Sequence, residues 1–454
     1  MKTIAIVGAG FCGTMIAVHL LRGGVRNARI VLIERSGRFT AGVAYGTAFS
    51  CHVLNVPTGR MSPFADDPDH FLRWARGCDA TIHGGTFAPR MLYGRYLASL
   101  LEDAAANGPL ERIAAEALEI STARNGQLMI QLKDQPTIEA DAAALAIGNY
   151  PPADPPLEDL RFYESPRYAR DPWSIEALSV NENDSVLLVG SGLTMLDVAM
   201  ALRERGVRGG VYAISRRGLL PQPHRESTTP PPHHDRPKTI DEWPRTAVGL
   251  LRAVRAEVNA AAAHKVDWRE VITSLRADTP ALWKSLTLTE RARFLRHLRP
   301  YWETHRHRAA PQIAAAVDQM IRSGQLRVLA GRLLSCNEKG DGVEVLIRRR
   351  SDPSPHTLRV GKVINCTGPD TDLARVRDPL IQRLREAGAI RPDALGLGLD
   401  TNDDGALIDS RGKVNPRMFL VGPLRKGQLW ENTAVPELRI EAERMARRLM
   451  QCCA

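Results

Sequence analysis

The sequence feature that most constrains the fold is a glycine pattern close to the start of the chain. Gly8, Gly10 and Gly13 follow the apolar run 3–7 directly and precede the apolar stretch 14–21. A run of β-branched residues is typical of a buried strand, and the longer stretch after it of a helix. In such a unit the first glycine permits a tight turn, the second leaves room for a pyrophosphate, and the third lets the helix pack on the strand. The pattern therefore predicts a dinucleotide at the helix N-terminus, whose unpaired N–H groups favour phosphate.

An acidic residue follows the next predicted strand. The apolar run 28–33 ends in Glu34, about 20 residues after the last glycine, as the dinucleotide fingerprint requires. A carboxylate at this position accepts hydrogen bonds from a ribose 2′-OH and repels a 2′-phosphate. We therefore expect FAD or NAD here, not NADP; the alternative is a glycine turn in an unrelated α/β unit. The residues predicted to bind this cofactor are Gly8, Gly10, Phe11, Cys12, Gly13, Glu34 and Arg35.

The pattern begins again after the proline-rich stretch 151–156. The apolar run 185–189 leads into Gly190 and Gly192 and then into a predicted helix that contains Thr194. Met195 stands where a third glycine would be, which predicts looser packing between helix and strand.

The second unit differs from the first at the end of its next strand. The run 211–214 is followed by Arg216 and Arg217 instead of an acid. Guanidinium groups bind phosphate in a bidentate manner, so these residues favour the 2′-phosphate of NADPH. The alternative is a pair of arginines on a solvated turn.

Both units close with a strand that runs into glycine, at Gly148 and at Gly368. We therefore predict an α/β protein with two Rossmann-like dinucleotide-binding domains. The FAD domain is discontinuous, over residues 1–165 and 369–454, and the NADPH domain, residues 166–368, is inserted in it with a helical insert over about 240–321. The helices expected are 69–76, 90–106, 247–263, 268–275, 288–321 and 434–450, and the strands outside the two glycine units include 112–120, 128–132, 137–140, 327–330 and 343–348.

Composition excludes several other classes. The formal net charge is +10, but no nucleic-acid recognition module is visible, so an anionic cofactor or solvated helix faces explain it better. The chain has no run of 18 apolar residues, so no membrane span is predicted. A strand that starts at residue 3 leaves no room for a signal peptide, so a cytoplasmic location is expected.

The seven cysteines show no Cys-x-x-Cys spacing, which argues against a zinc site and against a dithiol reductase centre. We read the Cys452–Cys453 pair as incidental and expect no metal; a homo-oligomer is compatible with the sequence.

Five segments carry a resemblance to a known family: 8–13, 42–46, 54–68, 301–308 and 429–439. On these the chain resembles, over nearly its whole length, the bacterial FAD/NAD(P)-binding protein family of two-domain flavoproteins. At a greater distance it is similar to the class B flavin monooxygenases and the N-hydroxylating monooxygenases. The resemblance implies FAD in the first unit and NADPH in the second.

The resemblance also implies roles for particular residues. Asn55 would lie beside the flavin as a neutral hydrogen-bond donor, in a segment whose Met61 would bind the cofactor; an Asx turn before Pro57 is the alternative. Flavoproteins of this kind have a late Gly-Asp pair whose carboxylate contacts the ribityl chain. Gly422 matches that glycine, but Pro423 replaces the acid, so Glu431 or backbone groups would have to substitute, near Thr433.

The function implied is an FAD-dependent oxidoreductase that uses NADPH. The first interpretation is a monooxygenase that acts with O2, through a C4a-(hydro)peroxyflavin, on a nitrogen, sulfur or carbonyl centre of a small molecule. The alternatives are a reductase that passes electrons to a quinone or a protein acceptor, and a non-catalytic FAD-binding redox sensor. The helical insert is expected to cover the flavin and form the substrate site. His305 and His307 are two residues apart on a predicted helix, so they do not share a face for metal binding; Arg306 and Arg308 fit either a phosphate contact or a solvated basic face.

Overall fold

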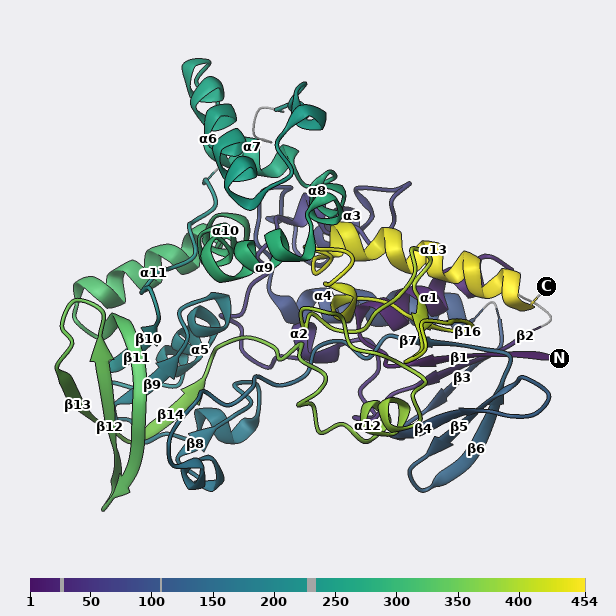
Figure 1. Ribbon diagram of the computed structural model, residues 1–454, viewed down its shortest axis with the longest axis horizontal. Coiled ribbons are helices and arrows are strands. Elements are labelled where there is room, and N and C mark those ends of the chain that lie inside the picture. Colours follow the sequence, from purple (N-terminus) through teal and green to yellow (C-terminus); the bar gives the residue numbers. More distant parts are fainter. Residues whose placement is uncertain (25–27, 107, 227–233, 454) are drawn as a thin grey trace.

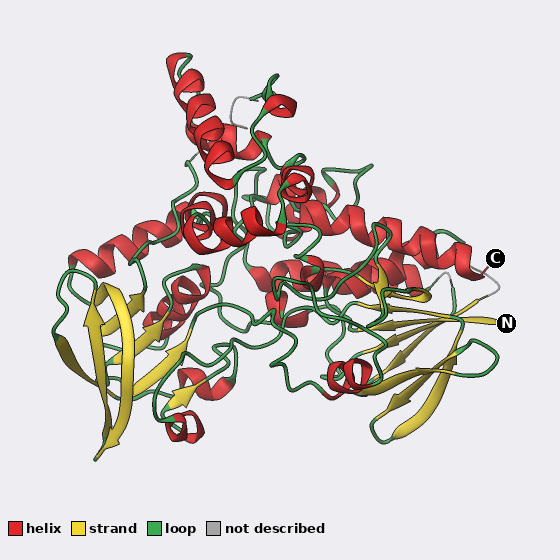
Figure 2. Ribbon diagram, in the orientation of Figure 1, coloured by secondary structure: helices red, strands yellow, loops and turns green. Residues whose placement is uncertain are grey.

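The computed structural model describes residues 1–24, 28–106, 108–226 and 234–453. Its strands gather in two separate groups, with helices between and above them (Figure 1, Figure 2). The first group, at the right of Figure 1, contains a six-stranded sheet in the order β15-β16-β7-β1-β2-β3. All neighbours in it are parallel except β15 and β16. The strands are β1 (Lys2–Val7), β2 (Ala28–Ile33), β3 (Leu110–Ile113), β7 (Ala142–Leu145), β15 (Ala406–Ile408) and β16 (Val414–Leu420).

The first sheet is covered on both faces, which explains why its strands are apolar throughout. Ile4 and Ile6 pack on one side, in the core that includes helices α1, α4 and α13. Ala5 and Val7 point to the other side, where a three-stranded sheet and α12 lie. The covering elements are α1 (Phe11–Arg22), α3 (His70–Cys78), α4 (Arg90–Ala105), α12 (Pro379–Glu386), α13 (Val435–Cys453), β4 (Ala117–Thr122), β5 (Leu128–Leu132) and β6 (Gln135–Ala140).

The second group contains a seven-stranded sheet in the order β13-β12-β11-β10-β9-β14-β8. Its part from β11 to β8 is parallel, and β12 and β13 continue it as antiparallel strands. Helices α5 and α11 cover the face to which Val186 and Leu188 point. The elements are β8 (Tyr168–Ala169), β9 (Val186–Val189), α5 (Leu193–Glu204), β10 (Val211–Ser215), α11 (Pro311–Arg322), β11 (Leu326–Lys339), β12 (Gly342–Arg349), β13 (Pro355–Val360) and β14 (Lys362–Asn365).

The two sheets repeat one arrangement. The strand that leads into each glycine turn, β1 or β9, lies between the next strand of its own unit, β2 or β10, and the strand that closes the unit, β7 or β14. The chain therefore reverses its direction of travel across the sheet beside β1 and beside β9, and such switch points are where open α/β sheets bind ligands. The first sheet draws only on residues 2–145 and 406–420, and the second only on 168–365. On this membership we propose the division into 1–165 with 369–454 and 166–368.

A group of helices follows the second glycine unit and rises above both sheets in Figure 1. It comprises α6 (Ala247–Ala263), α7 (Trp268–Ser274), α8 (Thr279–Ser285), α9 (Leu288–His297) and α10 (Arg299–Arg306). The single helix predicted over 288–321 is wrong, because the chain forms α9, α10 and α11 there. Pro300 and Pro311 lie in the first turns of α10 and α11, the helix positions that tolerate a residue without an N–H.

Other boundaries also differ from the prediction. The expected strand 112–120 is two strands, because β3 joins the parallel sheet whereas β4 turns away into the three-stranded sheet. Strand β11 is 14 residues long where four were expected, and β8, β13 and α8 were not predicted. Residues 227–233 of the predicted irregular loop 221–237 lie outside the described residues. Among the helices that the structure describes, none is long and apolar enough to cross a membrane.

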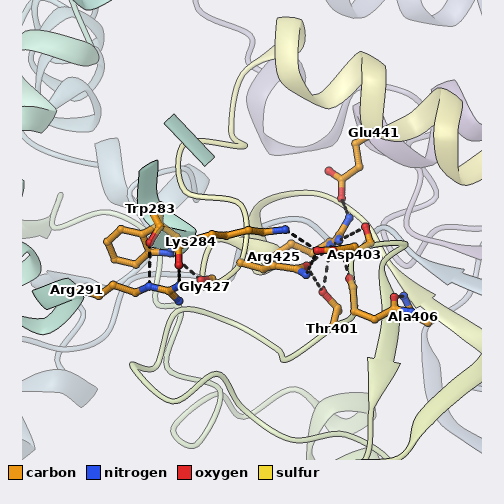
Figure 3. Close-up of polar contacts among 11 residues, drawn as sticks. Trp283, Lys284, Arg291, Thr401, Asp403, Ala406, Arg425, Gly427 and Glu441 are labelled. Carbon is orange, nitrogen blue, oxygen red and sulfur yellow. Dashed lines mark hydrogen bonds and ion pairs between the residues drawn. The ribbon is translucent and has the colours of Figure 1, made fainter. Parts of the chain in front are cut away.

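A buried ion pair ties the end of β16 to α13. Arg425 lies in the loop after β16, and its Nη1 is 2.7 Å from Oε1 of Glu441, with side chains only 3% and 8% exposed. Arg425 also donates to Thr401 and to the backbone oxygens of Asn402 and Asp403 (Figure 3). Arg425 thus joins α13 to the segment 401–403 and to the end of β16.

The same C-terminal segment also contacts the group of helices α6 to α10. Lys284 pairs with Asp403 at 2.5 Å, and Trp283 Nε1 donates to the oxygen of Gly427 at 2.8 Å (Figure 3). The indole of Trp283 also stacks on Trp430 at 4.6 Å between ring centroids. Helix α8 is therefore fixed to the loop that leads into α13.

The ion pair of Glu441 gives a test of this arrangement. Glu441→Gln leaves a buried guanidinium without its counter-charge, so we expect a loss of about 3–5 kcal/mol in the free energy of unfolding. The control is Glu443→Gln on the same helix, whose pair with Arg447 is exposed and should contribute about 0–1 kcal/mol. Urea unfolding of the two variants and the wild type measures both. Equal losses of unfolding free energy in the two variants would mean that the buried pair of Arg425 and Glu441 stabilises the fold no more than an exposed pair does.

Candidate dinucleotide sites and the junction between them

The first glycine turn is closed so tightly that two of its glycines have no room for a side chain. Gly8 has φ +99°, and a Cβ built on it would lie 2.4 Å from the oxygen of Ala146, at the end of β7. A Cβ on Gly13 would lie 1.8 Å from the oxygen of Gly8. The backbone N of Gly8 donates to Ile33 at 2.8 Å, which joins the turn to the end of β2. These contacts bring the ends of β7, β1 and β2 and the start of α1 to one point.

Gly10 is open in comparison. A Cβ on it would meet only the Cα of Gly42, at 3.9 Å. The loop that carries Gly42 is held by Thr40, whose N donates to the oxygen of Ala9 at 2.8 Å. Thr40 is buried and has φ +75°, an unusual conformation for a β-branched residue. Such strain persists where the surroundings impose it, and it is common at ligand sites.

Glu34 lies at the predicted place beside this turn. Its Oε2 accepts from the backbone N of Ala9 at 2.9 Å, and its Oε1 accepts from the N and the hydroxyl of Ser36. The carboxylate is thus fixed at the end of β2, where it would meet the ribose of a dinucleotide bound across the turn. Arg35 points elsewhere and pairs with Asp378 at 3.2 Å.

The second glycine turn has the same backbone and a different charge. Gly190 has φ +120°, its Cβ would lie 2.3 Å from the oxygen of Cys366, and its N donates to Ile214 at 2.8 Å. Ile214 therefore corresponds to Ile33, so Ser215 stands where the first unit has Glu34. The hydroxyl of Ser191 donates to Ser215 at 2.7 Å, so a neutral contact replaces the carboxylate.

The two arginines that follow Ser215 are not neutralised. Arg216 is exposed and Arg217 is half-buried, and among the described residues neither has a carboxylate within ion-pair distance. Arg217 is within cation–π range of an aromatic ring, with its Cζ 5.2 Å from the centroid of Tyr301. A 2′-phosphate at this position would thus meet cations and no anion.

The remaining predicted glycines leave open space at the same edges. A Cβ on Gly148, Gly192 or Gly368 would meet nothing within 4 Å, although Gly148 and Gly368 have φ of +71° and +89°. Thr194, in the first turn of α5, is half-buried. A pyrophosphate site requires some glycines that are tightly packed within the turn and others that leave open space beside it. Both kinds are present at each turn, so the residues fit a dinucleotide there.

Three predicted residues of the first site are buried in its core. The ring of Phe11 is stacked on Tyr93, with centroids 6.4 Å apart. Cys12 lies under Gly422, since a Cβ there would be 3.3 Å from its Sγ, and burial, with Glu441 nearby, raises the pKa of this thiol. Met61 is 3% exposed and accepts a hydrogen bond from the hydroxyl of Tyr93 at its oxygen. The side chains of Phe11 and Cys12 therefore pack within the hydrophobic core beside the first turn.

Asn55 lies where the two units meet. Its backbone oxygen accepts from Nε2 of His224 at 3.0 Å, across 169 residues of sequence. Burial, together with Arg308, lowers the pKa of His224 to about 3, so this imidazole is neutral at neutral pH. The side chain of Asn55 is half-buried.

A buried ion pair holds this junction. Arg90 of α4 contacts both carboxylate oxygens of Asp197 of α5, at 3.0 and 2.8 Å. Arg90 also donates to the oxygen of Val53, and His52 Nε2 lies 3.0 Å from the oxygen of Asp197. The segment that leads to Asn55 is therefore clamped between the two units.

Glu431 is placed differently from the carboxylate it was expected to replace. Its Oε1 accepts from Trp302 Nε1 at 2.9 Å, and its Oε2 is 3.1 Å from His307 Nε2. Burial alone would raise its pKa, but His307 and Arg306 outweigh burial and lower it. The carboxylate that reaches Gly422 is that of Glu441, which accepts from the Gly422 N at 3.1 Å. A ribityl contact by Glu431 stays a prediction; Thr433 beside it is exposed.

Sequence reasoning missed the residues that connect the units. Arg90 and Asp197 stand in ordinary amphipathic helices, and nothing in their local sequence distinguishes them from surface charges. Thr40 also carried no signal, because its positive φ depends on the contact with Ala9.

Comparisons with known proteins agree with this geometry. A family model described as FAD-NAD(P)-binding matches residues 5–150. No curated protein sequence matches the chain.

Three solved structures illustrate the likeness of the whole fold. The L-lysine 6-monooxygenase of Pseudomonas syringae matches with TM-score 0.68 and 15% identity, over 100% of both chains. The ornithine N-hydroxylase of Kutzneria sp. 744, determined with reduced FAD, NADP+ and L-ornithine, matches with TM-score 0.65 and 13% identity, over 99% of both. The bacillithiol disulfide reductase of Staphylococcus aureus matches with TM-score 0.57 and 12% identity, again over 99% of both.

These findings define the class of the fold. The chain has the fold of flavoproteins with two dinucleotide-binding domains, and its first unit matches the FAD-NAD(P)-binding model. The predicted fold class and the predicted resemblance are confirmed at this level.

The neutral state of His224 predicts a dependence of stability on pH. A histidine has an unfolded pKa of about 6.5, so below that pH the unfolded state binds a proton that the folded state binds only near pH 3. Its contribution to stability is therefore complete above about pH 6.5 and falls by about 2 kcal/mol between there and pH 5.

The matched variant is His224→Gln, which cannot titrate but keeps an N–H donor for the oxygen of Asn55. The loss of unfolding free energy between pH 7 and pH 5 should be smaller in this variant than in the wild type. An equal loss in both would mean that His224 titrates normally in the folded protein.

Proposed function

We propose that this protein is an FAD- and NADPH-dependent monooxygenase that hydroxylates the amine nitrogen of a small molecule. The observation that carries the proposal is the difference in charge between two turns of the same backbone. One turn holds Glu34 against Ala9, and the other presents Ser215, Arg216 and Arg217. An acid suits the unphosphorylated ribose of FAD, and free guanidinium groups suit the 2′-phosphate of NADPH.

The likeness to enzymes named for lysine and ornithine supports the choice of an amine nitrogen over the sulfur or carbonyl centre also considered. The proposed reaction converts an amine, O2, NADPH and a proton into a hydroxylamine, water and NADP+. Bound FAD would supply the chemistry, by accepting hydride from NADPH and activating O2. The first glycine turn and Glu34 would bind it, and the N-terminus of α1 would stabilise its pyrophosphate.

The residues at the junction fit a site that must keep protons away from activated oxygen. Asn55 offers an amide, which cannot donate a proton as an acid does, and the neighbouring His224 is neutral. The clamp between Arg90 and Asp197 fixes the distance between the units. We infer that Asn55 is the catalytic contact and that His224 positions its backbone.

Product analysis tests the proposed function. The FAD-loaded protein is mixed with NADPH, O2 and a panel of primary amines, among them lysine, ornithine and cadaverine. Hydroxylamine formed, peroxide formed and NADPH consumed are all measured. One hydroxylamine per NADPH with at least one amine is the expected result.

Two other outcomes would replace the proposal. Peroxide equal to NADPH with every amine would exclude an amine monooxygenase. Rapid anaerobic turnover with a quinone would favour a reductase, although the chain has no Cys-x-x-Cys pair for the disulfide version of that activity.

Asn55 gives a more specific prediction. In Asn55→Ala we expect the share of NADPH lost as peroxide to rise about fivefold or more, because losing one oriented donor costs roughly 1 kcal/mol or more in a closed site. Reduction of the flavin by NADPH should change little. The control is Asn125→Ala, in an exposed turn of the three-stranded sheet. Unchanged coupling in Asn55→Ala would remove Asn55 from the catalytic site.

A further inference from the structure

The contact between Arg217 and Tyr301 joins the second nucleotide turn to the helical group. The guanidinium lies over the phenol ring at 5.2 Å from its centroid, within the range of a cation–π interaction. Tyr301 belongs to α10, and 46% of its surface is exposed. An exposed ring that holds one face of a cation leaves the other groups of that cation accessible to a ligand.

Arg217 has little else to fix its direction. Its Nε is buried without a hydrogen-bond partner, and no described carboxylate pairs with it. In the first unit the corresponding position, two residues after Glu34 as Arg217 is two residues after Ser215, is Ser36, which hydrogen-bonds to Glu34. Ser215 cannot hold a guanidinium in the same way, so the aromatic ring is the contact that orients Arg217.

Helix α10 is itself held firmly on both sides. The backbone N of Gln222, in the loop after β10, donates to Thr304 at 2.9 Å, and the N of Ala309 returns a bond to Gln222. On the side of the first unit, Trp302 donates to Glu431. The ring of Tyr301 is therefore presented from a helix whose position relative to β10 is fixed.

We propose that Tyr301 is a specificity-determining residue, which orients Arg217 toward the 2′-phosphate of NADPH and so makes the second site prefer NADP-type over NAD-type nucleotides. The inference rests on the proposed function for its choice of nucleotide. A free arginine loses side-chain entropy when it binds phosphate, and a preoriented one has already lost part of it. Tyr301 is a positioning residue, because it acts on the phosphate through Arg217.

The experiment measures binding without turnover. Isothermal titration of the FAD-loaded protein uses two probes, 2′,5′-ADP and 5′-AMP, which differ by the 2′-phosphate. In Tyr301→Ala we expect the Kd of 2′,5′-ADP to rise about 3- to 10-fold, with that of 5′-AMP unchanged within about twofold. Tyr301→Phe keeps the ring, and no hydrogen bond involves the tyrosine hydroxyl among the described residues, so this variant should resemble the wild type.

A double variant separates positioning from direct contact. If the ring acts through the guanidinium, Tyr301→Ala should add nothing to Arg217→Ala, whereas independent effects would be additive. Arg217→Ala with Arg216 intact should already remove most of the preference for 2′,5′-ADP. Flavin content and melting temperature check that each variant is folded.

Several results would overturn the inference. Equal weakening of both probes in Tyr301→Ala would mean that the ring stacks on the adenine or supports the fold. Additive effects, or no effect, would mean that the ring does not orient Arg217. The proposed function can fail separately, since a protein that binds 2′,5′-ADP in this way but forms no hydroxylamine would keep the inference and lose the monooxygenase assignment.

Discussion

The arrangement of this protein depends on two places where neighbouring strand ends approach too closely for a side chain. At Gly8 a Cβ would collide with the oxygen of Ala146, and at Gly190 with the oxygen of Cys366. Only glycine can occupy such positions, and both have the positive φ that glycine tolerates. This closure sets α1 and α5 with their N-termini over the switch points of the two sheets, where phosphate is favoured.

The helical group gives the two sites a fixed relationship. It contacts the C-terminal segment through Trp283 on Trp430 and through Trp302 on Glu431, and it contacts the second site through Tyr301 on Arg217. Trp302 follows Tyr301 directly, so one helix contacts Glu431 of the C-terminal segment and Arg217 of the second turn with consecutive residues. Together with the pair of Arg90 and Asp197, this explains how the two similar units are held together.

The sequence predicted those features of the fold that depend on residues close together in the chain. The glycine turns, the buried strands on either side of them, and the contrast between Glu34 and the arginine pair depend on neighbours in the chain, and the structure places them as expected. The same is not true of contacts between distant segments. His224 meets Asn55 across 169 residues, and no pattern near either one predicts it. The wrong prediction of a single helix over 288–321 has a local cause. Two prolines interrupt that stretch, and each lies in the first turn of a new helix.

The central claim is that the first turn holds FAD and the second delivers NADPH to it. Anaerobic titration of the purified, FAD-loaded protein with NADPH tests this most directly, by the visible absorbance of the flavin. The account predicts that about one equivalent of NADPH removes that absorbance, and that NADH does so much more slowly at the same concentration. A protein that does not retain FAD, or a bound flavin that NADPH leaves oxidised, would contradict it.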